Sequence, residues 1–401
     1  MVNGNRRRIL KAGAAAGALG TLGLPLEAWS QAGDIVVGAA PPITGVFAFA
    51  GVGLNAGLAD YCEWRNTKGG VAGRKLRYIS EDSGYKVDQS VAIFKKIMAN
   101  NKPPVFYGDS TGWAKAIAPE VSSLGTVMTC SPSFSSDLAN PEKVPFYFMA
   151  GPTYEAMVAI LLEYIQRNAK GSQKPTVAFV YSDTEFGRDP IAASKARAEK
   201  MGIPVVLEVI TKPGAVDVSA EMIRMRRAKP DYVIFHGYVL APIPEFLRQM
   251  REAGLKSVGM GTIWSMDRST LDAMGAAGDG FTGIMPYRYS FDYVRTPAFT
   301  EMEAFGSRKP NNPWQTMFYT HGWLVGTLFS EIIDRTLKAK KELTGPNMKA
   351  ALESIEKFDT GGIFGVPISM KNHSIPVGRV YKVDYTGRNV VADSDWITIA
   401  S

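Results

Sequence analysis

The chain has few of the side chains that most often hold metal ions or form disulfides. Its 401 residues include two cysteines and three histidines. His236, His321 and His373 lack the H-x-x-x-H spacing of a metal site, and Cys62 and Cys130 do not form a C-x-x-C pair. The sequence therefore predicts no metal and no cofactor. We expect Cys62 and Cys130 to be buried free thiols, although the sequence leaves their pairing open.

The sequence also contains no G-x-x-x-x-G-K-[ST] phosphate loop, and we expect no nucleophile elbow, no catalytic residue and no enzyme activity. The histidines fit this interpretation. His236, at the end of a predicted strand, is either a hydrogen-bonded cleft residue or a donor to a ligand. His321 is expected to be structural, and His373 is expected to be exposed in a polar loop.

No dense lysine and arginine stripe with aromatic platforms occurs, which argues against nucleic acid as a partner. The formal net charge is +7. The first 32 residues contribute three of these charges, which leaves a mild excess that a solvated surface explains.

The N-terminus lacks an apolar run long enough for an ordinary membrane span. Residues 5–11 read Asn-Arg-Arg-Arg-Ile-Leu-Lys, which resembles a twin-arginine export signal. An alanine- and glycine-rich stretch and a small-residue cleavage region come after it. We therefore expect residues 1–32 to be a signal peptide, with export to the periplasm and no stable membrane insertion.

Short apolar runs alternate with helical patterns along most of the chain, which indicates an α/β fold with parallel sheets covered by helices. The length suits two lobes rather than one core. Helices are expected at 53–65, 88–99, 113–124, 153–167, 187–200 and 314–337. Strands are expected at 35–40, 76–79, 105–107, 126–128, 176–181, 205–210 and 231–235, with short strands in the tail.

The segment from Asn66 to Leu76 reads N-T-K-G-G-V-A-G-R-K-L and joins a predicted helix to a strand. This run resembles the periplasmic solute-binding proteins of branched-chain amino acid ABC importers, in which N-x-x-G-G-[IV]-x-G-[RK]-x-[LI] stands at this place. The resemblance implies a type I periplasmic binding fold with a three-crossover hinge. Lobe 1 would contain residues 34–151 and 286–363, and lobe 2 would contain residues 152–285 and 364–401.

Ligands of parallel α/β sheets collect at the carboxyl ends of strands, and five loops there are candidates. The loop at 108–112 has hydroxyls at a helix start, which can hold a carboxylate or simply cap the helix. The resemblance favours the ligand role for Ser110 and Thr111. The other candidates are polar anchors or aromatic walls, each with a turn, lid or packing role as the alternative. They are Phe49, Ser133, Phe134, Ser135, Phe186, His236, Tyr238 and Trp264.

The chain departs from the amino acid binders it resembles in two places. Those proteins carry a glutamate after an M-G-x run, where it pairs with the ligand ammonium, but here Ile263 and Trp264 follow. A buried ammonium without a carboxylate partner would be costly. In addition, Ala50 stands where a large aromatic is common. These departures favour an aromatic or apolar carboxylate over a zwitterion.

The resemblance implies a binding protein that closes two lobes over a small carboxylate and is then recognised by the permease subunits of an ABC transporter. A ligand-sensing receptor of the same fold, which feeds a signalling partner, is the alternative.

Overall fold

The computed structural model describes residues 33–169, 174–292 and 294–398. The predicted signal peptide, residues 1–32, lies outside the described residues. The chain divides into two units, Met1–Gly33 and Asp34–Ser401, and the second unit contains the described helices and strands.

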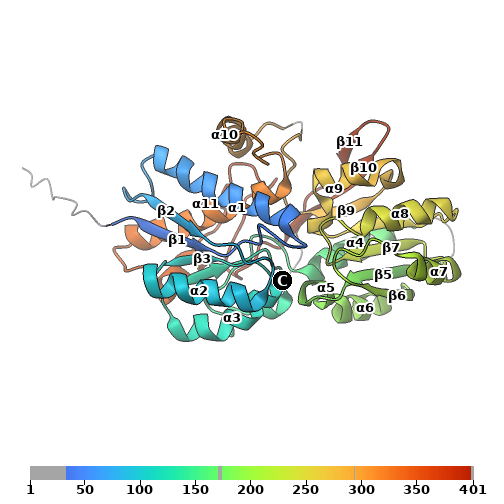
Figure 1. Cartoon of the computed structure of the whole chain (residues 1–401), viewed down its shortest axis with the longest axis horizontal. Coiled ribbons are helices and arrows are strands. Elements are labelled where there is room, and N and C mark those ends of the chain that lie inside the picture. The colour runs from blue at the N-terminus through green and yellow to red at the C-terminus, as the bar shows by residue number, and fades with distance from the viewer. Residues whose placement is uncertain (1–32, 170–173, 293, 399–401) are drawn as a thin grey trace, which may run out of the picture. The chain divides into compact units, whose positions relative to one another are not determined.

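The first sheet has four parallel strands in the order β2-β1-β3-β4. Figure 1 shows α1 and α11 on one side of this sheet and α2 and α3 on the other. The strands are β1 (Ile35–Ala39), β2 (Leu76–Ser80), β3 (Val105–Tyr107) and β4 (Met128–Cys130), and the helices are α1 (Ala48–Thr67), α2 (Val87–Asn101), α3 (Thr111–Leu124) and α11 (Met317–Lys338). Every residue of β1 is buried, as expected of a strand covered on both faces.

The second sheet follows the order β11-β10-β9-β8-β7-β5-β6, with β12 paired to β10. Strands β5 to β9 pair in parallel, whereas β10 to β12 are antiparallel. The strands are β5 (Val177–Ser182), β6 (Val205–Thr211), β7 (Tyr232–His236), β8 (Val258–Gly261), β9 (Thr282–Met285), β10 (Val377–Asp384), β11 (Asn389–Ala392) and β12 (Ile397–Thr398). The predicted parallel sheets are therefore present, with an antiparallel edge built by the tail.

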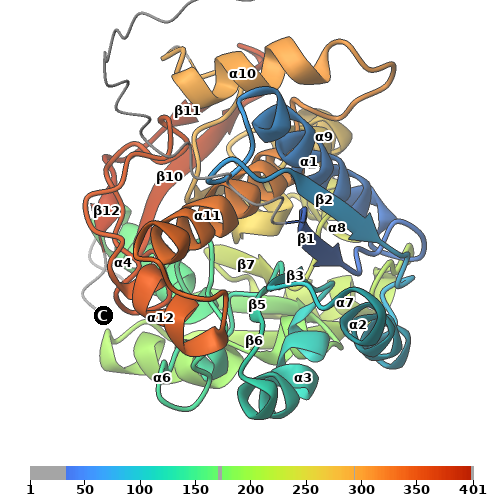
Figure 2. The same ribbon diagram turned by 90° about the vertical axis from the view of Figure 1, so that its left-hand side faces the viewer.

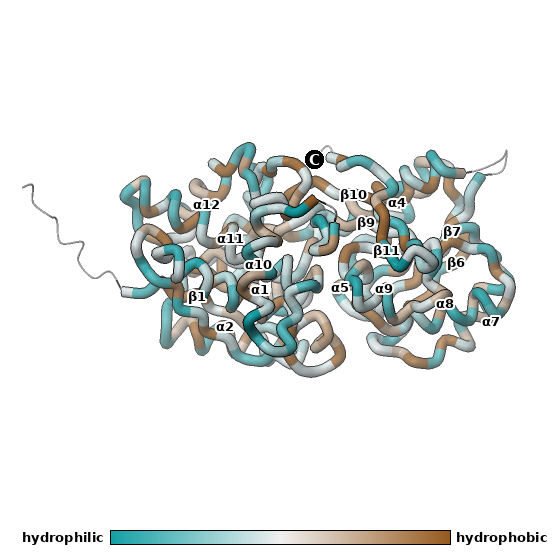
Figure 3. The backbone as a smooth tube through the Cα atoms, turned by 90° about the horizontal axis from the view of Figure 1, so that it is seen from above, coloured by the Kyte–Doolittle hydropathy of each residue, from teal (hydrophilic) through white to brown (hydrophobic). Residues whose placement is uncertain are grey.

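The remaining helices lie between and around these strands. They are α4 (Tyr154–Asn168), α5 (Glu185–Arg188), α6 (Ile191–Lys200), α7 (Ser219–Ala228), α8 (Ile243–Glu252), α9 (Arg268–Met274), α10 (Pro297–Gly306) and α12 (Gly345–Glu353), with 3-10 turns η1 (Ser136–Leu138), η2 (Ile263–Met266) and η3 (Gly275–Gly278). In the described part of the chain, no helix combines the length and apolarity of a membrane span. In Figure 3, hydrophobic residues are interspersed with hydrophilic ones along the backbone of the labelled helices.

Helices α1 and α11 pack against each other although some 250 residues separate them, as Figure 2 shows. Glycines allow the close approach. A Cβ at Gly57 would lie 2.1 Å from the Tyr319 carbonyl oxygen, and a Cβ at Gly322 would lie 2.3 Å from the Leu54 carbonyl oxygen. Real Cβ atoms do not come this close to backbone, so the helix pair depends on both glycines.

Several predicted boundaries differ from the structure. Helix α1 begins at Ala48 instead of residue 53, and β4 begins two residues later than expected. The predicted helix at 187–200 is two helices, α5 and α6, because Pro190 has no N–H to donate and starts a new helix.

Two further predictions concern single side chains. Cys62 and Cys130 are free and buried, as expected. His373 is buried, which contradicts its expected exposure. Its Nδ1 lies 2.9 Å from the Tyr147 carbonyl oxygen and its Nε2 lies 3.2 Å from Glu353 Oε1, so the loop folds inward to satisfy both ring nitrogens.

Candidate functional site

The loops that follow the strands of both sheets converge on one small cavity of about 30 Å3. It is lined by segments that follow β1, β2, β3 and β4 of the first sheet and β5, β7 and β8 of the second. The lining residues are Pro42, Phe47, Ala50, Leu54, Tyr85, Asp109, Ser110, Thr111, Pro132, Phe186, Val239 and Trp264. Because carboxyl ends of parallel strands are the usual ligand sites of such sheets, this cavity is the candidate binding site.

The N-terminus of α3 contributes the polar lining residues Ser110 and Thr111. Ser110 is the N-cap residue, with its Oγ accepting a hydrogen bond from Trp113 N at 3.1 Å and its carbonyl accepting from Ala114 N. The first four N–H groups of a helix have no partner within it. The N–H groups of Thr111 and Gly112 thus stay available to an anion, and the helix dipole favours negative charge there.

Residues 108–112 also fit the letters G-x-S-x-G, the pattern of a hydrolase nucleophile elbow, which was not expected in this chain. The structure does not give Ser110 the setting of a nucleophile. Its φ and ψ of −162° and 169° are ordinary extended values, whereas the elbow is strained. Among the described residues, no histidine hydrogen-bonds to its Oγ, which instead donates to Asp109 Oδ1 at 2.8 Å.

Trp264 forms the aromatic wall between the two halves of the site. It lies in η2, and its indole stacks on Phe134 at 5.4 Å and on Phe318 of α11 at 6.1 Å between ring centroids. Its Nε1 donates to the hydroxyl of Tyr154 at 3.0 Å. Only 2% of the residue is exposed. The ring therefore both lines the cavity and joins elements of the two sheets.

Phe186 and His236 pack against each other, but only Phe186 reaches the cavity. Phe186 lines it, whereas the His236 ring stacks edge-on behind Phe186 and Tyr154. Burial lowers the pKa of His236 to about 3, so the ring is neutral. Its Nε2–H donates to the Phe186 carbonyl at 2.9 Å and its Nδ1 accepts from Thr262 Oγ1 at 2.8 Å. Both nitrogens are occupied, which fits the hydrogen-bonded role rather than donation to a ligand.

The remaining predicted residues lie outside the cavity lining. The hydroxyl of Ser133 donates to Thr111 Oγ1 at 2.8 Å, and Ser135 Oγ contacts Asp189. Tyr238 is bound through its hydroxyl to Thr211 at 2.8 Å. Phe49 is 39% exposed and packs edge-on against Phe318, and Phe134 supports Trp264 from behind. Of the ten predicted residues, the structure brings Ser110, Thr111, Phe186 and Trp264 to the cavity.

Three lining residues carried no signal in the sequence. Leu54 lies within α1, Tyr85 follows β2 in a turn, and Val239 lies beyond the predicted Tyr238. Phe47 and Ala50 lie in the segment that follows β1, one of the strand-end loops expected to carry the ligand, and Asp109 lies in the predicted loop at 108–112. Among the described residues, no group of histidine, cysteine, aspartate and glutamate could hold a metal ion.

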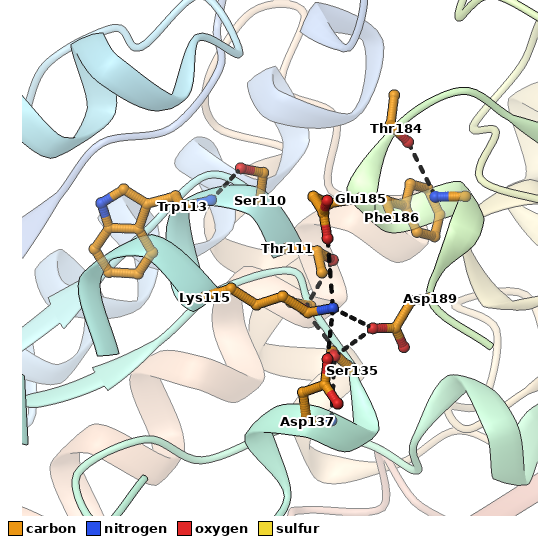
Figure 4. A network of polar contacts seen from close by, with 12 residues as sticks. Ser110, Thr111, Trp113, Lys115, Ser135, Asp137, Thr184, Glu185, Phe186 and Asp189 are labelled. Atoms are coloured by element: carbon orange, nitrogen blue, oxygen red, sulfur yellow. Dashed lines mark hydrogen bonds and ion pairs between the residues drawn. The ribbon is translucent and has the colours of Figure 1, made fainter. Parts of the chain in front are cut away.

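A charged network connects α3 with α5 beside the cavity, as Figure 4 shows. Lys115 Nζ lies 2.8 Å from Asp189 Oδ1, 2.8 Å from Asp137 Oδ2 and 3.5 Å from Glu185 Oε2. Burial lowers the pKa of Lys115, but its hydrogen bonds to Asp137 and Asp189 outweigh this and raise the pKa above its ordinary value. The Asp189 side chain is 3% exposed, so Lys115 neutralises a buried carboxylate.

Replacing Lys115 with methionine is expected to weaken this connection, because it leaves Asp189 buried without its cation. Hydrogen–deuterium exchange of the ligand-free protein measures the effect, and amides at 135–138 and 185–189 should exchange about tenfold faster, equivalent to about 1.4 kcal/mol. Lys96→Met is the matched control, since Lys96 pairs with Glu81 on an exposed surface. Equal exchange in the two variants would show that Lys115 does not hold the segments together.

Comparison with known proteins places this geometry among binding proteins. A family model described as "Periplasmic binding protein" matches residues 34–388. The chain is 27% identical over 358 residues to "Leu/Ile/Val-binding protein homolog 7" of Brucella suis biovar 1, covering 84% of this chain and 86% of the relative.

Solved structures of similar fold include proteins with different bound ligands. One is a branched chain amino acid ABC transporter protein from Thermus thermophilus with bound valine, at TM-score 0.83 and 24% identity, covering 92% of this chain and 97% of that one. Another is a solute binding protein from Rhodopseudomonas palustris BisB5 with 3,4-dihydroxy benzoic acid, at TM-score 0.73 and 22% identity, covering 88% and 93%.

Proposed function

The chain belongs to the periplasmic binding protein family, and from this premise we propose that it is the substrate-binding component of an ABC importer of the branched-chain amino acid type. The names of the relatives and structural neighbours favour transport over the signalling alternative. Family membership implies a periplasmic or extracellular location. The twin-arginine route is part of the proposal and depends on the motif in residues 5–11.

The ligand is a small carboxylate that binds at the N-terminus of α3. The available N–H groups of Thr111 and Gly112, with the Thr111 hydroxyl beside them, supply the donors that an oxyanion needs. Valine and 3,4-dihydroxy benzoic acid, the ligands named for two structural neighbours, both carry a carboxyl group. This common group supports the assignment.

The body of the ligand is aromatic or apolar, and the cavity wall is the observation that carries this step. Phe47, Tyr85, Phe186 and Trp264 surround the space together with aliphatic side chains. The strand-end position that follows Met260-Gly261-Thr262 is filled by buried Ile263 and Trp264, so no acid is available there for an ammonium group.

The binding cycle follows from the division of the site between the two sheets. The carboxylate docks first on α3, and the second sheet then closes with Phe186 and Trp264 over the ligand. Crossings near Gly151, Pro286 and Phe364 would serve as the hinge between the two lobes, and permease subunits would recognise the closed form. Closure uses part of the binding energy, so the measured affinity is lower than the contacts alone would give.

Mass spectrometry of small molecules that remain bound through native purification tests the ligand class. We expect a carboxylic acid with an aromatic or apolar body. Calorimetric titration with leucine and with benzoate-type acids then tests selectivity, and the acids should bind more tightly. Micromolar leucine binding without a response to the acids would reject the proposed ligand class.

A further inference from the structure

The carboxylate of Asp189 is buried, and its side-chain partners among the described residues belong to a different part of the chain. Asp189 directly follows α5, which comes after β5 of the second sheet, and its side chain is 3% exposed. Its Oδ1 lies 2.8 Å from Lys115 Nζ of α3 and accepts a hydrogen bond from Ser135 Oγ in the loop after β4 of the first sheet. We call residues 108–138 the α3 side of the cavity and residues 182–189 the α5 side. Asp189 is therefore held by the α3 side although it belongs to the α5 side.

The ion pair of Lys115 and Asp189 lies beside residues that line the cavity. Lys115 is four residues beyond Thr111 in α3, so the two side chains share one face of the helix, one turn apart. Asp189 is three residues beyond Phe186, at the end of α5. Thr111 and Phe186 line the cavity, whereas Lys115 and Asp189 do not. Figure 4 shows the pair crossing from α3 to α5, so it connects the two sides without lining the cavity itself.

The α3 side and the α5 side are closed on each other in this structure. The cavity between them measures about 30 Å3, whereas ligand pockets usually measure roughly 300–1,000 Å3. A carboxylic acid with an aromatic or apolar body therefore enters and leaves only when the two sides move apart. Contacts that cross from one side to the other control that movement.

Asp189 is the carboxylate for which Lys115 matters most. Lys115 Nζ also lies 2.8 Å from Asp137 and 3.5 Å from Glu185, but these side chains are 75% and 62% exposed, and exposed ion pairs contribute little stability. The Asp189 carboxylate stays buried as long as the two sides are together, and a buried carboxylate without its cation is costly. Water can hydrate it only when the sides separate. Loss of Lys115 therefore favours the separated arrangement.

We propose that Lys115 and Asp189 are positioning residues for ligand binding. Their ion pair holds Phe186 of the α5 side against Thr111 of the α3 side and so keeps the ligand enclosed, although neither partner touches it. This role rests on the proposed function, because it requires a ligand that is enclosed between the two sides.

A positioning role predicts a specific kinetic signature. Binding begins with the two sides separated, where Lys115 makes no contact with a ligand, so the association rate should not depend on the pair. Release requires the sides to separate and should become about tenfold faster in Lys115→Met. Affinity then falls about tenfold for every ligand, since the population of the closed form changes and the ligand contacts do not. A residue that touches the ligand would instead change affinity by a factor that differs between ligands.

Stopped-flow tryptophan fluorescence measures both rates, with benzoate, 4-methylpentanoate and leucine as probes. Lys115→Met combined with Asp189→Asn should release the probes within about threefold of the wild-type rate, because no charge is then left buried without a partner. Lys115→Arg, which keeps the cation, should behave like the wild type. Lys195→Met is the matched control, since Lys195 pairs with Glu208 and both residues belong to elements of the second sheet and its helices.

Hydrogen–deuterium exchange of the ligand-free variants tests the ion pair without any ligand. The amides at 185–189 should exchange about tenfold faster in Lys115→Met and return to within about threefold of the wild type when Asp189→Asn is added. If Asp189→Asn slows neither this exchange nor the release of the probes, Lys115 does not act through Asp189 and the inference is wrong. Equal release rates in Lys115→Met and Lys195→Met would also overturn it.

The ligand class and the positioning role can fail separately. If no probe binds the wild type at millimolar concentration, the proposed ligand class fails, and the exchange measurement still decides whether the pair joins the two sides. If Lys115→Met weakens the probes by unequal factors, Lys115 contacts the ligand, which overturns the positioning role but leaves the proposed function intact.

Discussion

Trp264→Ala is expected to lower the free energy of unfolding by about 3–5 kcal/mol and to weaken ligand binding about 100-fold. The indole is almost fully buried and stacks on Phe134 and Phe318, which belong to segments of the first sheet and its helices. Truncation removes these contacts and one wall of the cavity together. Urea unfolding measures the first effect, and titration with the ligand retained through purification measures the second.

The Trp264→Phe variant distinguishes the contribution of the aromatic ring from that of its hydrogen bond. Phenylalanine keeps an aromatic ring between Phe134 and Phe318 but cannot donate to the Tyr154 hydroxyl. We expect it to cost about 1–2 kcal/mol of stability, the usual effect of one buried hydrogen bond and some lost volume. If the alanine variant loses no more stability and affinity than the phenylalanine variant, the stacking contacts do not join the two halves of the site.

Gly57→Ala is expected to destabilise the protein by about 3 kcal/mol, near the upper end of the cost of overpacking. The added methyl carbon would lie 2.1 Å from the Tyr319 carbonyl oxygen and 3.0 Å from Trp323 N, so α1 and α11 must move apart. The higher helix propensity of alanine, worth about 1 kcal/mol, opposes the loss without reversing it. Urea unfolding of the ligand-free protein, followed by circular dichroism, measures the change.

Gly112→Ala provides the matched control for Gly57→Ala. It is the same substitution within a helix, but the nearest atom to the new carbon is the end of the Val87 side chain at 2.9 Å, which can turn away. Its stability should stay unchanged or rise slightly. Equal stability of the two variants would show that α1 and α11 do not depend on backbone contact at Gly57.

Much of the fold could be predicted because it depends on local patterns. The parallel pairing of β1 with β2 agrees with the βαβ unit expected around the Asn66–Leu76 run, where Gly69, Gly70 and Gly73 adopt the positive φ values that end the helix and turn the chain. The first residue of a helix could not be predicted where a contact with a distant residue decides it. Helix α1 begins five residues early, packed against Pro42, and Gly51 leaves room for the Pro42 carbonyl.

The candidate site could be predicted at the level of loops but only partly at the level of residues. Ser110 and Thr111 follow from the start of α3, because a helix N-terminus fixes where its first N–H groups point. Ser133 and Phe134 stand in a predicted loop, yet they support Thr111 and Trp264 from outside the lining. Their direction depends on neighbours that are distant in sequence, and periodicity contains no information about those neighbours.

The sequence by itself determined that strands and helices alternate and that small and polar residues follow the strands. These features depend on propensities that act over a few residues. Only the tertiary structure decided that Trp264 lies between Phe134 and Phe318, that Lys115 reaches Asp189, and that segments after the strands of both sheets line one small cavity. Each of these depends on contacts between segments far apart in the chain, whose energies arise only when the sheets and their helices are packed together.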